Sequence, residues 1–397
     1  MSPKLDAPII IIGNGGSGST LLDRTLNAHP SIEMLGEMKY LAPDAWIAFN
    51  GADANTTLRN LGQHFDSDPS LEARIKSSPV TFRNLLIRLE REEMSRRASL
   101  MRELIAEWFC LNTLRARIWG FKEITNNGAR QWDCYDLMFP AATWVHVVRH
   151  PLDWLFSGAR LSGQQLSKET VPSLLKTWID TVEMSRQRRR TKRYFEIKYE
   201  ALCANPEGAL GPLFADLGET WHDECQYALQ RQWGDRSHRA PLTGEIIEAV
   251  LATDGLGHLM NECGYSLGDR PPMPKSNQPP SAKLKLLAKG GFKLRGHFYR
   301  EIGRCWEIDL SDTTIAGELS AVADDIGFWE RSPLRLFESG KPLGPPHALH
   351  YQIRRDGGGK YSHWQNRLLF STSDNSNPNR NGQIYSFDLQ ADFEALK

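Results

Sequence analysis

The hydrophobic pattern of the first 268 residues alternates short apolar runs with longer stretches of helical periodicity. Runs with the length of a buried strand lie at 8–12, 118–122, 143–148 and 194–198. Apolar residues recur every three to four positions, as in amphipathic helices, at 19–28, 83–115, 152–160, 171–190, 206–217 and 244–262. Strands that alternate with helices predict an α/β fold with a mainly parallel sheet and helices on both faces.

The pattern changes after a stretch rich in proline. Asp269–Ser281 contains five prolines, and we expect a linker over 269–284. The turn clusters Asp356–Gly359 and Ser373–Gly382 then separate short segments rich in aromatic residues. These segments, predicted as strands, are 297–309, 326–337, 347–354, 364–371 and 383–388. The sequence therefore predicts an α/β domain over 1–268 and a smaller β-rich module over 285–397.

Composition and charge narrow the possible partners. The 397 residues include 48 Lys and Arg and 48 Asp and Glu, so no global field recruits nucleic acid. No run approaches the about 20 apolar residues of a membrane span, and the first residues lack the apolar core of a signal peptide. The six cysteines are scattered without a C-x-x-C pair. We therefore expect a cytoplasmic protein with reduced thiols and no metal site.

The segment after the first apolar run has the pattern of a phosphate-binding loop. Gly13, Gly15, Gly16 and Gly18 follow Ile9–Ile12, and a helical pattern then opens. Glycines let the backbone approach an anion closely, and the free amides of a first helical turn face it. The amides predicted to bind phosphate are those of Gly15, Gly16, Ser17, Gly18, Ser19 and Thr20.

Three kinds of anion loop compete for this segment. Gly13, Gly15 and Gly18 spell the dinucleotide fingerprint G-x-G-x-x-G, and an acidic residue, Glu33 or Glu37, follows roughly 20 positions on. The loop of triphosphatases has a lysine where this chain has Ser19, which argues against triphosphate chemistry. The third is the loop of sulfotransferases, [RK]-[ST]-G-[ST]-[ST]-L-[LM], which 17–22 matches in all but its first position. The segment alone leaves the first and third open.

Two later segments add groups that bind phosphate or a nucleotide. The apolar strand 143–148 ends at Arg149, and Ser157 follows two helical turns after Pro151 opens a helix. A guanidinium and a hydroxyl in this arrangement can hold one phosphate between them. Farther on, Tyr199 follows the strand 194–198 ahead of the next helix.

With these segments the chain resembles the sulfotransferases that use 3′-phosphoadenosine 5′-phosphosulfate (PAPS). The family's motifs occur in the family's order over residues 8–265: Ser17–Leu22, His29-Pro30, Gly36-Glu37, Lys122 in Trp119–Glu123, Arg149 with Ser157, and Tyr199-Glu200 with Pro206 and Leu217-Gly218. The dinucleotide fingerprint explains only the first of them. The resemblance implies a P-loop-type sheet, PAPS as sulfuryl donor without a metal, and a small-molecule or glycan acceptor.

The resemblance also implies a role for individual residues. Glu37, just after the expected second strand, would be the general base, and Lys122 the catalytic cation. Arg149 with Ser157 would bind the 3′-phosphate, and Tyr199 would contact the nucleotide. Two basic residues that would close over the nucleotide are Arg236 and Arg239.

One position departs from the family. The loop normally carries Arg or Lys before Ser-Gly, and this chain has Gly16. We expect Lys122 to supply the missing charge, with Lys39 and Arg24 as alternatives, and Gly16 to need a positive φ. The departure keeps open a protein that binds PAPS or its product without catalysis. A dinucleotide-dependent oxidoreductase is a further alternative.

Other polar groups have plainer interpretations. His29 and His150 are expected to be structural. The basic run Arg186–Arg193 is either a solvated helix end or a surface that attracts an anionic acceptor or the 3′-phosphate. Asn377, Asn379 and Asn381 have the spacing of a calcium loop, but neutral ligands and flanking strands favour a simple turn. The C-terminal module loosely resembles extensions of bacterial enzymes that modify glycans, which favours a carbohydrate or glycosylated metabolite as acceptor.

Overall fold

The computed structural model describes residues 4–37, 94–108, 111, 116–124, 129–190, 193–230, 243–266, 283–286, 291–301, 303–311, 313–325 and 328–389. The chain divides into two compact units, residues 1–276 and 277–397. Most of the expected linker 269–284 falls outside the described residues, but its last two residues belong to the strand β6, Lys283–Leu286.

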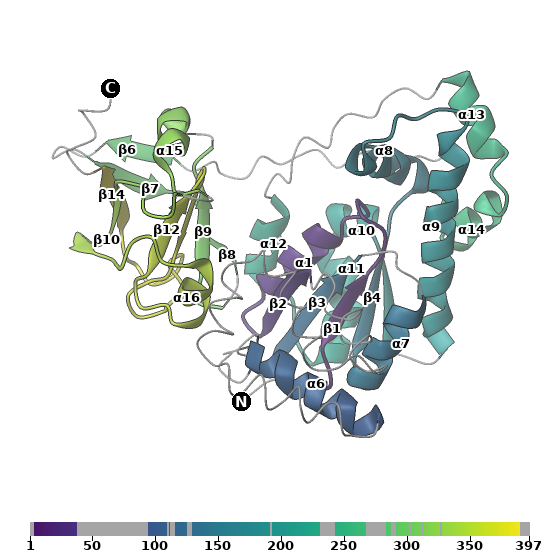
Figure 1. Cartoon of the computed structure of the whole chain (residues 1–397), viewed down its shortest axis with the longest axis horizontal. Helices are drawn as coiled ribbons and strands as arrows, with labels where there is room; N and C mark the ends of the chain where they lie inside the picture. The colour runs from purple at the N-terminus through teal and green to yellow at the C-terminus, as the bar shows by residue number, and fades with distance from the viewer. Residues whose placement is uncertain are drawn as a thin grey trace. The chain divides into compact units, whose positions relative to one another are not determined.

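The first unit contains a five-stranded sheet in which every pairing is parallel (Figure 1). Its order is β2-β3-β1-β4-β5. The strands are β1 Ile9–Ile12, β2 Ile32–Glu37, β3 Ile118–Glu123, β4 Thr143–Val148 and β5 Arg193–Lys198. The four apolar runs predicted as strands are confirmed. The sequence placed Glu37 just after the second strand. In the structure it is instead the last residue of β2.

The order of the strands places the phosphate-binding loop. The chain leaves β1 toward β3 and β2 on one side, and crosses to β4 and β5 on the other. Ligands of open parallel sheets bind beyond the carboxyl ends of strands at such a switch point. The loop 13–18 after β1 and Arg149 after β4 both lie at this edge.

The described helices of the first unit follow the predicted periodicity with few exceptions. They are α1 Ser19–Asn27, α6 Met94–Trp108, α7 Ala129–Met138, α8 Pro151–Ser162, α9 Thr170–Gln187, α10 Tyr199–Ala204, α11 Pro206–Leu217, α12 Asp223–Gln230, α13 Gly244–Leu251 and α14 Leu256–Glu262. The predicted helix 244–262 is two helices, because Gly255 adopts a left-handed φ of 76°. The helices α7, α10 and α12 were not predicted. No helix in the described part of the chain is both long and apolar enough to span a membrane.

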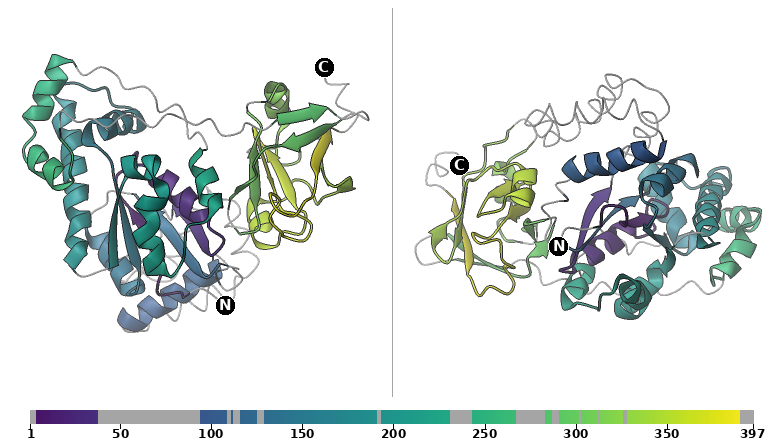
Figure 2. Two further views of the ribbon diagram at one scale, coloured as in Figure 1. Left: turned by 180° about the vertical axis from the view of Figure 1, so that it is seen from behind. Right: turned by 90° about the horizontal axis from the view of Figure 1, so that it is seen from below.

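Both faces of the sheet are covered. On one face Ile9, Ile11 and Val145 pack against α1 and α11, and Figure 2 shows the helices that follow β5 in front of the sheet. On the other face the ring of Phe121 on β3 lies 5.2 Å from that of Tyr135 on α7, and a second apolar cluster, beyond the end of β4, joins α8, α9, α13 and α14 around Trp154 and Trp178. Burial on both faces explains why the strands are continuous apolar runs with no alternation.

The second unit contains two antiparallel sheets, ordered β11-β10-β14-β7-β6 and β12-β13-β9-β8. Its strands are β6 Lys283–Leu286, β7 Phe292–Arg295, β8 Tyr299–Arg300, β9 Trp306–Asp309, β10 Leu334–Glu338, β11 Lys341–Pro342, β12 Tyr361–Trp364, β13 Arg367–Phe370 and β14 Tyr385–Leu389. Its helices are α15 Ala316–Val322 and α16 His350–Arg355. The β-rich interpretation is confirmed, but the strand predicted at 347–354 is wrong, since α16 occupies most of it.

The asparagine-rich turn of the second unit is held by its own side chains. Asn379 exchanges two hydrogen bonds with the backbone of Phe298, at 2.7 and 2.9 Å. Asn381 donates to the hydroxyl of Tyr385 at 2.8 Å. These amides are used structurally, as expected for a turn. Within the described ranges no group of three or more His, Cys, Asp or Glu is placed to hold a metal ion.

Candidate functional site

The loop after β1 takes a conformation that requires its glycines. Gly13, Gly16 and Gly18 have positive φ angles of 146°, 83° and 103°. A Cβ atom on Gly13 would lie 2.7 Å from the carbonyl oxygen of Val147. One on Gly18 would lie 2.2 Å from the ring of Tyr199. The positive φ expected at Gly16 is confirmed, so a side chain at this position would strain the loop.

A side chain of α8 and one that follows β4 hold two successive carbonyls of the loop. The indole Nε1 of Trp154 donates to the carbonyl of Gly15 at 2.8 Å, and Arg149 Nη1 donates to that of Gly16 at 3.0 Å. In a trans peptide the N–H points opposite to the C=O. Trp154 therefore turns the amide of Gly16 away from α8. Asn14 attaches the same loop to α9 through Thr181, at 3.1 Å.

The loop presents amides without protein partners. Among residues 15–20, Ser17 donates its amide to Asn14, at 3.0 Å. In the described part of the chain, nothing accepts a hydrogen bond from the other five amides. The Ser17 hydroxyl is also buried without a partner. Buried polar groups are normally satisfied, so these donors fit the oxygens of a bound phosphate or sulfuryl group.

Three predicted residues meet at the start of α1. Lys122 Nζ donates to Thr20 Oγ1 at 2.9 Å and lies 3.6 Å from Glu37 Oε2. Strand register causes the meeting, since Glu37 on β2 is paired with Lys122 on β3. Lys122 is buried, and its charge adds to the positive end of the α1 dipole. The place is therefore suited to an anion, and the Glu37 carboxylate lies at its edge beside Lys122.

Arg149 and Tyr199 form the second part of the site. The guanidinium carbon lies 4.6 Å from the centre of the Tyr199 ring, and the ring edge packs on Gly18. Arg149 is buried, and its Nε has no hydrogen-bond partner. Ser157 is half-buried on α8, and within the described chain no hydrogen bond joins it to Arg149. The structure thus brings Arg149 and Tyr199 to the loop itself.

A residue that sequence reasoning did not assign supports this arrangement. Glu200 accepts from the amide of His150 at 2.9 Å and from the hydroxyl of Tyr265 at 2.7 Å. It thereby fixes the backbone that follows Arg149. Burial and the Glu200 charge raise the pKa of Tyr265, so the hydroxyl stays a donor. His150 caps α8 by accepting from the amide of Leu152, which confirms its structural role.

The contacts of His29 are also structural, as expected from the sequence. Its ring lies 3.0 Å from the carbonyl of Thr220 and 5.3 Å from the ring of Phe214. These contacts join the end of α1 to α11, through Phe214, and to the segment after α11, through Thr220. Arg236 and Arg239 lie outside the described residues and stay predictions.

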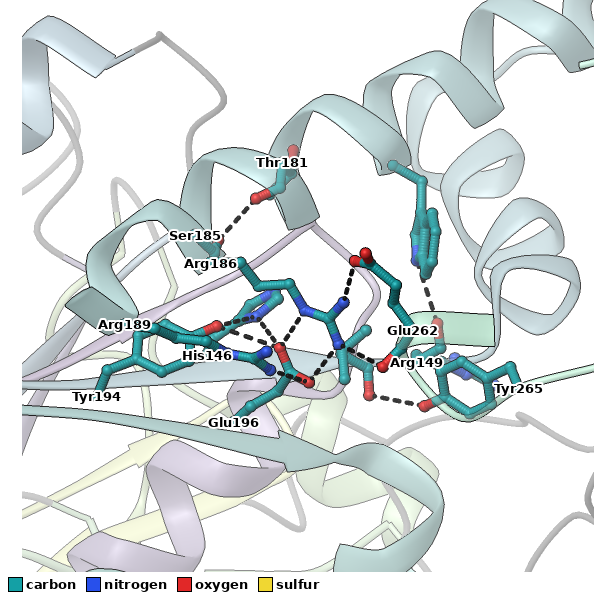
Figure 3. Close-up of polar contacts among 12 residues, drawn as sticks. His146, Arg149, Thr181, Ser185, Arg186, Arg189, Tyr194, Glu196, Glu262 and Tyr265 are labelled. Atoms are coloured by element: carbon teal, nitrogen blue, oxygen red, sulfur yellow. Dashed lines mark hydrogen bonds and ion pairs between the residues drawn. The ribbon is translucent and has the colours of Figure 1, made fainter. Parts of the chain in front are cut away.

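The first part of the basic run surrounds one carboxylate. Glu196 accepts from Arg186 at 2.7 Å and 2.8 Å, pairs with Arg189 at 2.7 Å, and lies beside His146 and Tyr194 (Figure 3). Burial opposes the charge on Glu196, but hydrogen bonds from Arg186 and His146 keep its pKa below the ordinary value. Burial lowers the pKa of His146, so this ring is neutral at pH 7. Arg186 and Arg189 are therefore structural.

Other cations of the run are paired as well. Arg188 donates to Asp136 at 2.6 Å and lies over the ring of Trp144 at 4.0 Å. Arg193 pairs with Asp216. Neither interpretation of the run from sequence describes these four arginines, which fasten α9 and β5 to neighbouring elements. Pairing also leaves them no free charge for a nucleotide.

A family model matches most of the first unit. The model of the sulfotransferase family matches residues 8–223, more than half of the chain. No curated protein matches. Among solved structures, the sulfotransferase domain of the Synechococcus PCC 7002 olefin synthase is 16% identical and has a TM-score of 0.42, with 67% of this chain and 96% of that chain covered.

Two further sulfotransferase structures are similar at lower scores. STF9 from Mycobacterium avium is 14% identical over 66% of this chain and 76% of its own, with a TM-score of 0.37. Mouse SULT7A1, solved in complex with PAP, is 12% identical over 58% of this chain and 64% of its own, with a TM-score of 0.31. On the family match, which begins at β1 and ends in α12, this chain belongs to the sulfotransferase family.

Proposed function

We propose that the chain moves a sulfuryl group from PAPS to an acceptor hydroxyl of a carbohydrate or glycosylated metabolite. The observation that carries this is the meeting of Lys122, Thr20 and Glu37 beside the unpaired amides of the loop. It combines anion donors, a buried cation and a carboxylate at one helix start. The donor supplies the sulfuryl group, and the protein supplies binding, charge and proton removal.

The roles of the residues follow from their contacts. The amides of Gly15, Gly16, Gly18, Ser19 and Thr20 and the hydroxyl of Ser17 hold the 5′-phosphate. Lys122 supplies the charge that other members carry in the loop, where this chain has Gly16. Lys122 reaches the loop through Thr20, so it is placed to stabilise negative charge on the leaving phosphate oxygen.

The carboxylate of Glu37 serves as general base. It lies 3.6 Å from Lys122 Nζ, on the strand next to β3. A carboxylate there can accept the proton of the acceptor hydroxyl as the new O–S bond forms.

The nucleotide end of the donor is assigned to the second part of the site. Arg149 with Ser157 binds the 3′-phosphate, and Tyr199 contacts the nucleotide. Arg149 contributes a second effect, since its hydrogen bond to Gly16 shapes the loop. We assign Arg236 and Arg239 to the same end.

The alternatives differ from this proposal in specific features. A dinucleotide-binding sheet places its first and second strands side by side. Here β3 lies between β1 and β2, which argues against an oxidoreductase. A protein that binds PAPS without catalysis would have no need for a buried lysine beside a carboxylate, and Lys122 with Glu37 argues against it.

Nucleotide binding tests the proposal. Adenosine 3′,5′-bisphosphate should raise the melting temperature of the full chain, whereas NAD should not. Arg149→Ala should weaken the binding of adenosine 3′,5′-bisphosphate more than that of adenosine 5′-monophosphate. The reason is that a charge-assisted contact to the 3′-phosphate contributes about 1.5–3 kcal/mol. A rise in melting temperature with NAD alone would contradict the proposal. Equal losses of affinity for both adenosine ligands would show that Arg149 does not bind the 3′-phosphate.

A further inference from the structure

The second unit carries aromatic side chains that its core does not enclose. Phe328 and Trp329 are 62% and 41% exposed, although aromatic side chains of this size are usually buried. The ring of Trp329 lies 5.9 Å from that of Trp364, and His350 meets Trp364 edge-on at 5.3 Å. We call Phe328, Trp329, Trp364 and His350 the aromatic surface. It lies beyond residues 8–223, so the family match does not account for it.

Ordered elements support the aromatic surface. Trp364 is the last residue of β12, in the β12–β13 hairpin, and α16, which begins at His350, packs on both strands (Figure 1). Arg331 lies over the ring of Phe328 at 5.5 Å, and its Nε is tied to the carbonyl of Ala323 at 2.7 Å. The rings are thus held before any ligand arrives, which lowers the entropy cost of binding.

A hydrogen-bonding group borders the aromatic surface. Asp324 forms a bridge with Trp364, and its carboxylate accepts from His347 Nδ1 at 3.0 Å. Because Nδ1 faces Asp324, Nε2 is the ring nitrogen left for a further hydrogen bond. No described residue pairs with that nitrogen, and His347 is partly exposed. His347 can therefore form a hydrogen bond with a hydroxyl of a bound molecule.

These features match one class of ligand. The faces of a gluco-configured sugar ring carry C–H groups with partial positive charge, and aromatic faces are negative. Its hydroxyls lie around the rim of the ring, where His347 and Arg331 offer hydrogen-bonding groups. Four side chains are also far fewer than the about 20–30 residues that each partner gives to a stable protein interface.

We propose that the aromatic surface binds an oligosaccharide of gluco-configured rings. The adjacent indoles of Trp329 and Trp364, tilted by 39° to each other, offer apolar area to a sugar ring. The binding itself is independent of sulfuryl transfer. That the bound saccharide is also the sulfation acceptor rests on the proposed function.

Calorimetric titration of the full chain with cellohexaose and with chitohexaose tests the proposal. The wild-type chain should bind at least one of them, and Trp329→Ala and Phe328→Ala should each weaken that binding about tenfold or more, the equivalent of about 1.4 kcal/mol. His347→Ala should weaken it less. The matched control is Ile384→Ala, which removes an equally exposed apolar side chain of the same unit and should leave binding unchanged.

The outcomes separate this proposal from its rivals. Absence of binding to both saccharides would overturn it, as would equal losses in Trp329→Ala and Ile384→Ala. A wild-type chain that binds no saccharide but self-associates through Trp329 would identify the surface as a contact between two copies. Adenosine 3′,5′-bisphosphate should bind Trp329→Ala as it binds the wild type, so a failure of the proposed sulfotransferase function would appear in that second titration.

Discussion

Replacing Gly18 with alanine adds a methyl group where the anion loop, α1 and Tyr199 meet. Gly18 is the N-cap of α1 and has a φ of 103°, which disfavours any side chain. The new Cβ would also lie 2.2 Å from Tyr199 Cδ2. Tyr199 is buried with Arg149 across its ring, so the ring cannot move without moving Arg149.

The expected loss of stability has two parts. Left-handed backbone at a residue with a Cβ costs roughly 1–2 kcal/mol. Forcing an extra methyl into a packed site costs typically about 1–3 kcal/mol more. Gly18→Ala should therefore lower the free energy of unfolding by about 2–5 kcal/mol.

Gly255 provides a matched control. It is also a left-handed N-cap, for α14 with a φ of 76°, and nothing lies within 4 Å of the position of its Cβ. Gly255→Ala should lose only the conformational part, about 1–2 kcal/mol. The two variants differ by the overlap with Tyr199 alone.

Scanning calorimetry of the full chain measures both losses. Each kcal/mol shifts the melting temperature by about 2–4 °C for a domain of this size. The transition of the first unit is the one that adenosine 3′,5′-bisphosphate raises in the wild type. Gly18→Ala should melt lower than Gly255→Ala and lose the shift by the ligand, which Gly255→Ala should keep. If Gly18→Ala melts no lower than Gly255→Ala, or keeps the full ligand shift, the packing argument at Tyr199 is wrong.

Three further predictions concern the catalytic carboxylate, the loop and the buried histidine. Glu37→Gln should retain adenosine 3′,5′-bisphosphate binding and lower turnover by about 10²–10⁴-fold. Unchanged turnover at saturating acceptor would show that another group is the general base. Trp154→Phe removes the donor to Gly15, so calorimetric titration should show weaker nucleotide binding; Trp119→Phe, which loses a 3.0 Å bond to the carbonyl of Lys4, should bind normally. Burial lowers the pKa of His146, so below pH 6.5 the unfolded chain takes up a proton that the folded chain does not. Stability of the first unit should therefore fall as the pH drops from 7 to 5, by up to about 1.4 kcal/mol per pH unit. His146→Gln should flatten this slope when melting temperatures are measured at a series of pH values. An unchanged slope would show that His146 does not cause the pH dependence.

The sheet of the first unit could be predicted because its strands are buried on both faces. Ile9–Ile12 and Thr143–Val148 are apolar without alternation, and helical periodicity separates them. The second unit was harder. The segment 347–354 suggested a strand, yet α16 forms over most of it. Ile353 is the one buried residue of α16, and tertiary contacts rather than the local pattern decide the conformation.

The site was predictable where its residues lie in contiguous motifs. Gly18, Lys122 and Arg149 were placed by local patterns, and the strand order brings them to one edge of the sheet. The bond between Trp154 and Gly15 spans 139 positions, and neither residue type signals it. Such contacts depend on how helices pack on the sheet, which periodicity does not specify. The same is true of the pairing of Arg186 with Glu196.

Sulfuryl transfer itself is the most direct test. The full chain is incubated with PAPS and cellohexaose or chitohexaose, and mass spectrometry follows both products. The wild type should yield sulfated saccharide and adenosine 3′,5′-bisphosphate in equal amounts, and Lys122→Ala should yield neither while still folding. Lys176→Ala, which removes an exposed lysine paired with Asp180, should match the wild type. A wild-type chain that binds PAPS but sulfates no hydroxyl acceptor, or Lys122→Ala with most of its rate intact, would contradict the proposed mechanism.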